Sequence, residues 1–306
     1  MPGTGAVGYT LMGEFPLKTP PIGRWFGQGK QHPIAYMTLS LILLTALAYL
    51  GSLALYVRFL YSSRPLVGRA ATALLAAGLV LHYFVLLERS RGTHAVPYKD
   101  LYGSLSLFGW LLALTYLGLE FYHRQRSVGA FVLPFVLVFF LVAHLARPVA
   151  LQPPPARGPV FAFHVTLSIL AYSAFALSFV MSLMFLAQER VLRGHKMGTV
   201  IWRFPPLELL ERMSRSSVFI GLVAIIIGTL LGFVWVDRLT GEVWRTDWKY
   251  VVTLLVVLLY ALYLIVARTT SWRGARASKL CIFNFVLVVL SFTVVNLYLS
   301  HSHRYF

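Results

Sequence analysis

Five histidines in or beside apolar stretches are the residues of this sequence best suited to chemistry. They are His82, His144, His164, His301 and His303. A neutral imidazole is a common metal ligand, and two imidazoles on opposite faces of an iron give a low-spin haem centre. A histidine in a membrane helix can also act only as a hydrogen-bond partner of a neighbouring helix, and for His82 both interpretations stay open. For His144 the simplest prediction is a helix-end residue in the membrane interface, with a place in a site as the alternative.

A segment rich in tryptophan and charge, GFVWVDRLTGEVWRTDWK over residues 232–249, provides the second group of candidates. Tryptophan is enriched at the lipid headgroup level, so composition alone predicts an aromatic belt. Flat aromatic rings can also form the walls of a porphyrin site. Just before the segment's first tryptophan, Gly228 and Gly232 share one helix face and would let a neighbouring backbone approach closely. The candidates here are Trp235, Trp244, Asp247, Trp248 and Lys249.

Membrane helices are the elements that must position these residues. The chain is 58% hydrophobic and 12% charged, unlike a soluble domain. A span needs about 20 apolar residues, so the sequence predicts an all-α polytopic membrane helical bundle. We expect an extramembrane tail at 1–33, without the features of a signal peptide, and a single transmembrane domain at 34–306. The eight predicted spans are roughly 35–61, 68–88, 103–122, 127–146, 159–188, 216–236, 250–268 and 279–300.

The distribution of basic residues predicts how the bundle is oriented. With both termini outside, 15 of the 27 Lys and Arg residues lie in the inner loops, which the positive-inside rule favours. The net charge of +17 therefore orients helices in the lipid bilayer, and we expect no nucleic acid partner. The single cysteine, Cys281, leaves no CxxCH site for covalent haem attachment.

In this orientation the five candidate histidines and the tryptophan segment all lie toward the outer face. Their convergence would suit haem, with aromatic walls around the porphyrin and basic groups near its propionates. Ser168 and Tyr172 follow His164 at i+4 and i+8, so the three polar groups share one helix face. Such a face is expected to turn into the bundle.

The segment 232–249 resembles the tryptophan-rich segment of the cytochrome c assembly family, which includes the CcsA and ResC type and the related HemX proteins. The chain differs from the family at Thr240 and Thr246, where tryptophan is usual, and at Arg238, where an acid is usual. It therefore resembles an altered haem-handling loop. The family pattern is GxVW, four residues, WG, two residues and WxWDxK, and it matches at Gly232, Trp235, Gly241, Trp244, Asp247 and Lys249.

The resemblance extends over about residues 68–306 and carries implications for the histidines. His164, followed eight residues later by Tyr172, falls on an external haem ligand of the family, and His303 falls on the second. His301 could substitute for His303. Ile265 occupies a position where some members have an intramembrane haem histidine, which makes a haem held there doubtful.

Residues 205–217, PPLELLERMSRSS, resemble another family segment, LPxLELLDRL. Their pattern predicts a short amphipathic surface helix before the sixth span. We expect two i,i+4 ion pairs on it, Glu208 with Arg212 and Glu211 with Arg215.

The resemblance implies a haem-handling protein of cytochrome c biogenesis in the bacterial cytoplasmic (inner) membrane. It would hold haem b at the outer face and present it to apocytochrome c, together with a CcsB/ResB-type membrane partner. We expect the chain to be at most a component of a haem lyase (holocytochrome c synthase) and otherwise non-enzymatic. The altered loop also favours a HemX-like regulatory membrane protein of haem biosynthesis. A third interpretation is a b-haem electron-transfer subunit of a larger membrane complex.

Overall fold

The computed structural model describes residues 33–62, 64–93, 101–145, 158–194, 204–240, 248–269 and 272–294. Across these residues the regular structure is entirely α-helical, which confirms the predicted all-α polytopic bundle. Helices α1, α2, α3, α5 and α6 are long and apolar enough to cross a membrane, and α4 and α7 are shorter apolar helices. The eight helices are α1 (Pro33–Ser62), α2 (Pro65–Thr93), α3 (Leu101–His123), α4 (Gly129–Leu145), α5 (Gly158–Arg193), α6 (Leu207–Thr240), α7 (Trp248–Val266) and α8 (Ala275–Val294).

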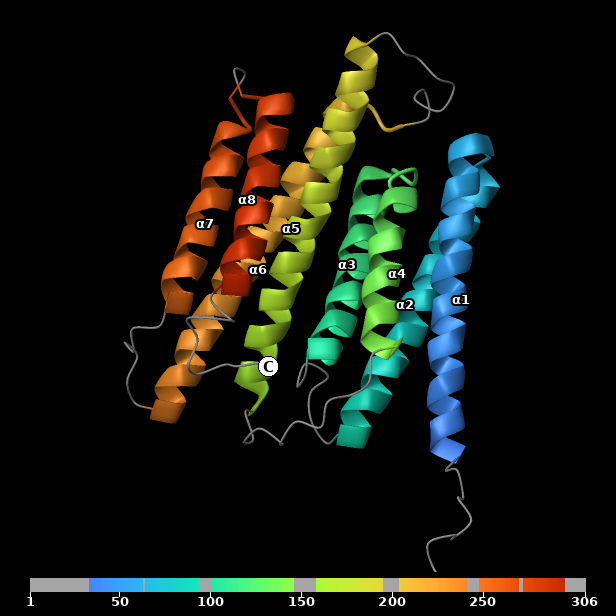
Figure 1. Cartoon of the computed structure of the whole chain (residues 1–306), viewed down its shortest axis with the longest axis vertical. Coiled ribbons are helices and arrows are strands. Elements are labelled where there is room, and N and C mark those ends of the chain that lie inside the picture. Colours follow the sequence, from blue (N-terminus) through green and yellow to red (C-terminus); the bar gives the residue numbers. More distant parts are fainter. Residues whose placement is uncertain are drawn as a thin grey trace, which may run out of the picture.

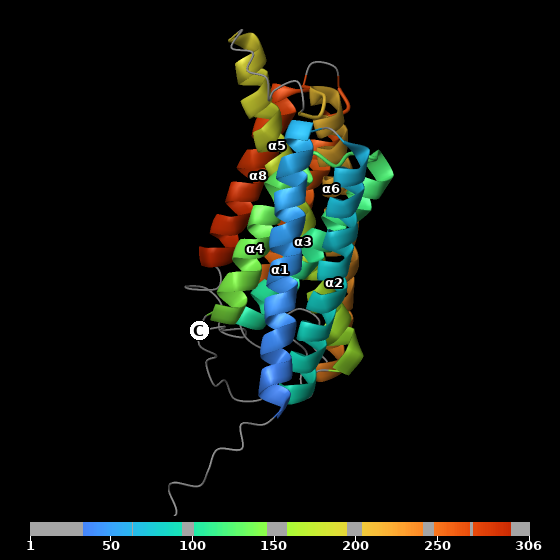
Figure 2. The same cartoon turned by 90° about the vertical axis from the view of Figure 1, so that its right-hand side faces the viewer.

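Consecutive helices run in opposite directions, so α1 begins and α8 ends toward the same end of the bundle (Figure 1). We call this the histidine end, after His144 and His164, which lie in the last turn of α4 and near the start of α5. The opposite end, where α5 ends and α6 begins, is the arginine end, after Arg190 and Arg212. The long axes of the helices follow the long axis of the molecule (Figure 2).

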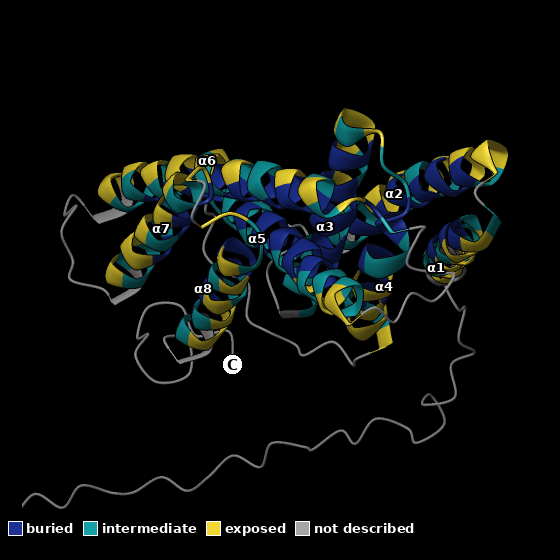
Figure 3. Ribbon diagram, turned by 90° about the horizontal axis from the view of Figure 1, so that it is seen from above, coloured by how far each residue is buried: buried dark blue, intermediate teal, exposed yellow. Residues whose placement is uncertain are grey.

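The helices form two groups, α1–α4 and α5–α8, which meet mainly where α3 packs against α5 (Figure 3). Two main apolar cores hold the bundle together. The first joins α1–α4 to residues 177–185 of α5 and to Leu210 and Met213 of α6, and it includes the fully buried rings of Tyr49, Tyr116 and Phe140. The second lies within α5–α8 and includes the rings of Phe175 and Tyr260. Large apolar side chains on the outer surfaces of α1 and α7 are exposed, as expected of helices that face lipid.

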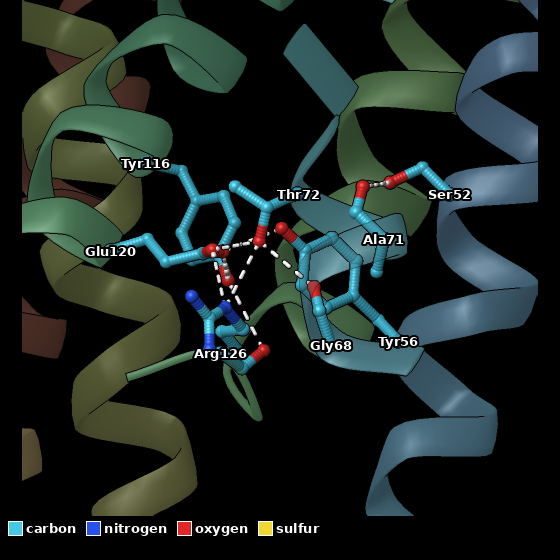
Figure 4. A network of polar contacts seen from close by, with 8 residues as sticks. All are labelled: Ser52, Tyr56, Gly68, Ala71, Thr72, Tyr116, Glu120 and Arg126. Atoms are coloured by element: carbon cyan, nitrogen blue, oxygen red, sulfur yellow. Dashed lines mark hydrogen bonds and ion pairs between the residues drawn. The ribbon is translucent and has the colours of Figure 1, made fainter. Parts of the chain in front are cut away.

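A buried polar network ties the first three helices together at the arginine end (Figure 4). Glu120 of α3 is only 2% exposed. Its carboxylate accepts hydrogen bonds from Tyr56 Oη at 2.5 Å, from Tyr116 Oη at 2.7 Å and from Thr72 Oγ1. The Nε of Arg126, between α3 and α4, lies 3.6 Å from the same carboxylate. A charge inside a bundle is costly unless it is paired and hydrogen-bonded, and Glu120 is both.

The start of α6 differs from the prediction. Residues 207–217 are not a separate surface helix, because α6 runs without a break from Leu207 to Thr240. Leu210 and Met213 are completely buried, and Ser217 Oγ donates to the carbonyl of Ala174 on α5 at 2.6 Å. The amphipathic pattern therefore marks the face that packs on α5, not a face at a membrane surface. Both predicted ion pairs are present, Glu208 with Arg212 at 3.3 Å and Glu211 with Arg215 at 2.7 Å.

Candidate functional site

His164 lies near the start of α5, with its imidazole against α6. Its Nδ1 is 2.6 Å from the carbonyl oxygen of Gly228. Because a carbonyl only accepts, Nδ1 must carry the proton of the neutral ring, and the lone pair is then on Nε2. No described residue provides a hydrogen bond to Nε2. Histidines that bind metals are commonly oriented by this kind of bond between the second ring nitrogen and a backbone carbonyl.

The ring fits there because α5 and α6 approach closely at two glycines, as predicted. A Cβ on Gly232 would lie 2.8 Å from both Nδ1 and Cε1 of His164. A Cβ on Gly228 would meet the Cβ of Leu167 and the backbone nitrogen of Ser168, each at 3.4 Å. The Nδ1–Cε1 edge of the imidazole therefore lies over the bare backbone of α6.

Aromatic rings surround this histidine at the same end of the bundle. Phe161, one turn before His164, packs on Trp235 with ring centroids 4.6 Å apart and an angle of 44°. The Phe161 centroid is 6.2 Å from that of His164. Trp235 thus contacts the ring beside the histidine. Sequence reasoning missed Phe161, although its position three residues before His164 on a helix was a usable signal.

The other two residues predicted to share a polar face with His164 are Ser168 and Tyr172. Ser168 Oγ donates to the His164 carbonyl of its own helix at 2.8 Å, and a Cβ on Gly228 would come within 3.3 Å of that hydroxyl oxygen. His164 and Ser168 therefore both turn toward α6, into the bundle as predicted. Tyr172 is half-buried and packs against the second core.

His82 has a different environment. It is fully buried in α2, with Nδ1 3.1 Å from Tyr49 Oη and Nε2 2.9 Å from Ser106 Oγ. Both ring nitrogens are engaged by hydroxyl groups, which favours the hydrogen-bonded interpretation. His144 lies nearby, 6.3 Å from His82 between ring centroids, with Phe140 in contact with both rings. Its Nδ1 donates to the Phe140 carbonyl at 2.7 Å, as a helix-end residue can.

Several predicted site residues fall outside the described part of the chain. His301, His303, Trp244 and Asp247 lie in undescribed segments. Trp248 and Lys249 begin α7, but their side chains are also outside the description. At the position where some family members have a haem histidine, the side chain of Ile265 is 65% exposed on the outer surface of α7.

Comparison with known proteins finds sequence similarity over most of this chain. The family model described as cytochrome c assembly protein matches residues 98–303. Protein HemX of Brevibacillus brevis is 24% identical over 251 residues, which cover 81% of this chain and 92% of that protein. Cytochrome c biogenesis protein CcsA of Porphyra purpurea is 25% identical over 249 residues, covering 68% and 78% respectively. The CcsA protein of Gloeobacter violaceus is 24% identical over 298 residues, covering 79% and 87%.

Proposed function

The chain belongs to the cytochrome c assembly protein family, and from this premise we propose that it binds haem b at the histidine end of the bundle for delivery to apocytochrome c. It is a multi-pass membrane protein by its helices and its family. We place it in the bacterial cytoplasmic membrane with the histidine end outside, since 15 of the 27 Lys and Arg residues are assigned to the loops at the other end. A CcsB/ResB-type membrane protein is the proposed partner.

The observation that carries the proposal is the contact between His164 Nδ1 and the carbonyl oxygen of Gly228. The Nδ1 is committed to this carbonyl at 2.6 Å, so the Nε2 keeps a lone pair in a neutral ring. This lone pair fits a haem iron, which takes neutral imidazole as a ligand. His303 would be the second histidine to hold the haem, with His301 as the substitute. Haem, when bound, supplies the group that becomes joined to the cytochrome.

The surrounding residues receive supporting roles. Phe161 and Trp235 provide apolar aromatic surface beside His164, 4.6 Å apart between ring centroids. We infer that Trp244 and Trp248 extend this wall, and that Asp247 and Lys249 provide its polar rim, with Lys249 near a propionate.

His82 and His144 are assigned away from the iron. His82 has both nitrogens within hydrogen-bond distance of Tyr49 and Ser106, so iron binding would cost it one of those bonds. His144 has Nδ1 on its own helix and could line the same end of the bundle, as could Tyr172 further along α5.

A regulatory role of the HemX type is the second candidate. The observation that favours it is the coverage of the HemX relative, 92% of whose length matches. The substitutions at Thr240 and Thr246 agree with it, because the loop has lost two tryptophans of the assembly pattern. Deleting the gene separates the two functions: loss of all c-type cytochromes supports assembly, and altered abundance of glutamyl-tRNA reductase supports regulation.

The experiment that tests haem binding is a reduced-minus-oxidised absorption spectrum of the protein purified in detergent. We expect a b-type spectrum that is lost in His164→Ala, weakened in His303→Ala and partly restored in the first variant by added imidazole. His123→Ala is the matched control, because His123 lies at the arginine end, 3.1 Å from Ser216 Oγ. The proposal is contradicted if the wild type shows no haem spectrum, or if neither His164→Ala nor His303→Ala changes the spectrum. Haem that stays bound and cycles between redox states without transfer supports the electron-transfer interpretation instead.

A further inference from the structure

We propose that Gly228 and Gly232 of α6 are positioning residues that together hold the His164 imidazole in the Nδ1-protonated form. We call this pair the glycine seat. Its importance for iron rests on the proposed function, but its effect on the histidine does not. The seat assigns a physical role to the first residue of the tryptophan-rich segment, which lies in the helix and not in the loop.

Gly232 provides the space. A Cβ at this position would come within 2.8 Å of Nδ1 and of Cε1, closer than nonbonded carbon atoms approach in folded proteins. The imidazole is at the end of a side chain with two rotatable bonds, so it can move away more easily than the two helix backbones can separate. Alanine at position 232 should therefore displace the ring while leaving the helix pair assembled.

Gly228 provides the acceptor, four residues earlier on the same face. The hydrogen bond from Nδ1 to its carbonyl is 2.6 Å long. A ring displacement of more than about 0.6 Å away from the carbonyl therefore takes the bond past the ordinary limit of about 3.2 Å. The carbonyl is within reach because nothing larger than hydrogen separates Gly228 from Leu167 and Ser168. Once the bond is lost, the proton is free to move to Nε2, and a protonated Nε2 cannot bind iron.

The same helix pair offers a close control. A Cβ on Gly221 would overlap the Phe175 ring at 2.5 Å and approach the Ala171 carbonyl at 3.1 Å. Gly221→Ala therefore places a comparable clash between α5 and α6, three helical turns from Gly232. Gly118→Ala is the control without a clash, because no atom of the described residues beyond its own helix segment would lie within 4 Å of its Cβ.

The test measures the histidine directly, with and without haem. Magic-angle-spinning NMR of protein labelled with ¹⁵N-histidine reports which ring nitrogen carries the proton, and His164→Gln identifies the His164 signals. We expect the Nδ1-protonated signature in the wild type, in Gly221→Ala and in Gly118→Ala, and its loss in Gly232→Ala. Haem titration of the same proteins should show a ~10-fold or larger loss of affinity in Gly232→Ala alone, the usual scale for removing a second-shell partner of a metal ligand.

The outcomes separate the seat from the proposed function. If Gly232→Ala keeps the Nδ1-protonated signature, or if Gly221→Ala loses it equally, the glycine seat is wrong. If the wild type shows the expected signature but binds no haem, the seat stands and haem binding is refuted.

Discussion

Replacing Glu120 by alanine should destabilise the protein strongly, because one carboxylate serves four other groups. It accepts from the hydroxyls of Tyr56, Tyr116 and Thr72 and pairs with Arg126. Removing one partner of a buried ion pair costs about 3–5 kcal/mol, and each buried donor left alone about 1–3 kcal/mol.

These costs do not add in full, because two hydroxyls have second partners. Tyr116 Oη lies 3.3 Å from the carbonyl of Arg126, and Thr72 Oγ1 lies 3.0 Å from the carbonyl of Gly68. The Arg126 side chain is 34% exposed and can turn toward water. Tyr56 loses its 2.5 Å hydrogen bond to the carboxylate. The lower end of the range, about 3 kcal/mol, is therefore the expected loss in the free energy of unfolding.

Thermal unfolding in detergent, followed by tryptophan fluorescence, measures this loss. For a chain of this size about 3 kcal/mol corresponds to a fall in melting temperature of roughly 4–6 °C. Glu120→Gln should fall between the wild type and Glu120→Ala, since the amide keeps one acceptor but no charge. Glu88→Ala is the control, because its pair with Arg91 is on the surface, where such pairs contribute about 0–1 kcal/mol. If Glu120→Ala melts within about 2 °C of Glu88→Ala, the network does not hold the first three helices together.

Two further predictions concern buried groups away from the network. His82→Phe should lower the free energy of unfolding by about 2–4 kcal/mol, because the buried hydroxyls of Tyr49 and Ser106 each lose a partner; equilibrium unfolding measures this, and a b-type spectrum lost in the folded variant would contradict the assignment of His82 away from the iron. Cys281 should resist maleimide until the protein unfolds, because its thiol is fully buried 3.2 Å from Ser178 Oγ. Mass spectrometry before and after denaturation measures the extent of labelling. Rapid labelling of the folded protein would show that α8 is not packed as described.

Sequence patterns predicted what depends on local composition. Apolar stretches placed all eight helices, and the spacing of Gly228 and Gly232 predicted the close helix pair. The end of a helix was harder to predict than its existence. Pro205 and Pro206 lie directly before α6, which begins at Leu207. No sequence signal separates the amphipathic first turns of this helix from its membrane-spanning part, and the helix continues to Thr240.

Pairings between distant helices were not predictable in this way. Tyr56 and Glu120 are 64 residues apart, and Glu120 lies near the end of the predicted span 103–122. No periodicity indicates which helix will place a hydroxyl opposite that carboxylate. The same holds for His82, whose two hydroxyl partners come from α1 and α3. The sequence offered a choice between ligand and structural residue, and only tertiary contacts favour one.

The contrast between His82 and His164 shows what those contacts decide. Both are single imidazoles in apolar helices, and a pattern search treats them alike. Tyr49 and Ser106 engage both nitrogens of His82, so binding a metal there would break an existing hydrogen bond. Gly228 engages only Nδ1 of His164, and its bond favours the ring form whose Nε2 can bind a metal. The two histidines therefore differ in the number of their hydrogen-bond partners, which is set by glycine on α6 and by hydroxyl groups on α1 and α3.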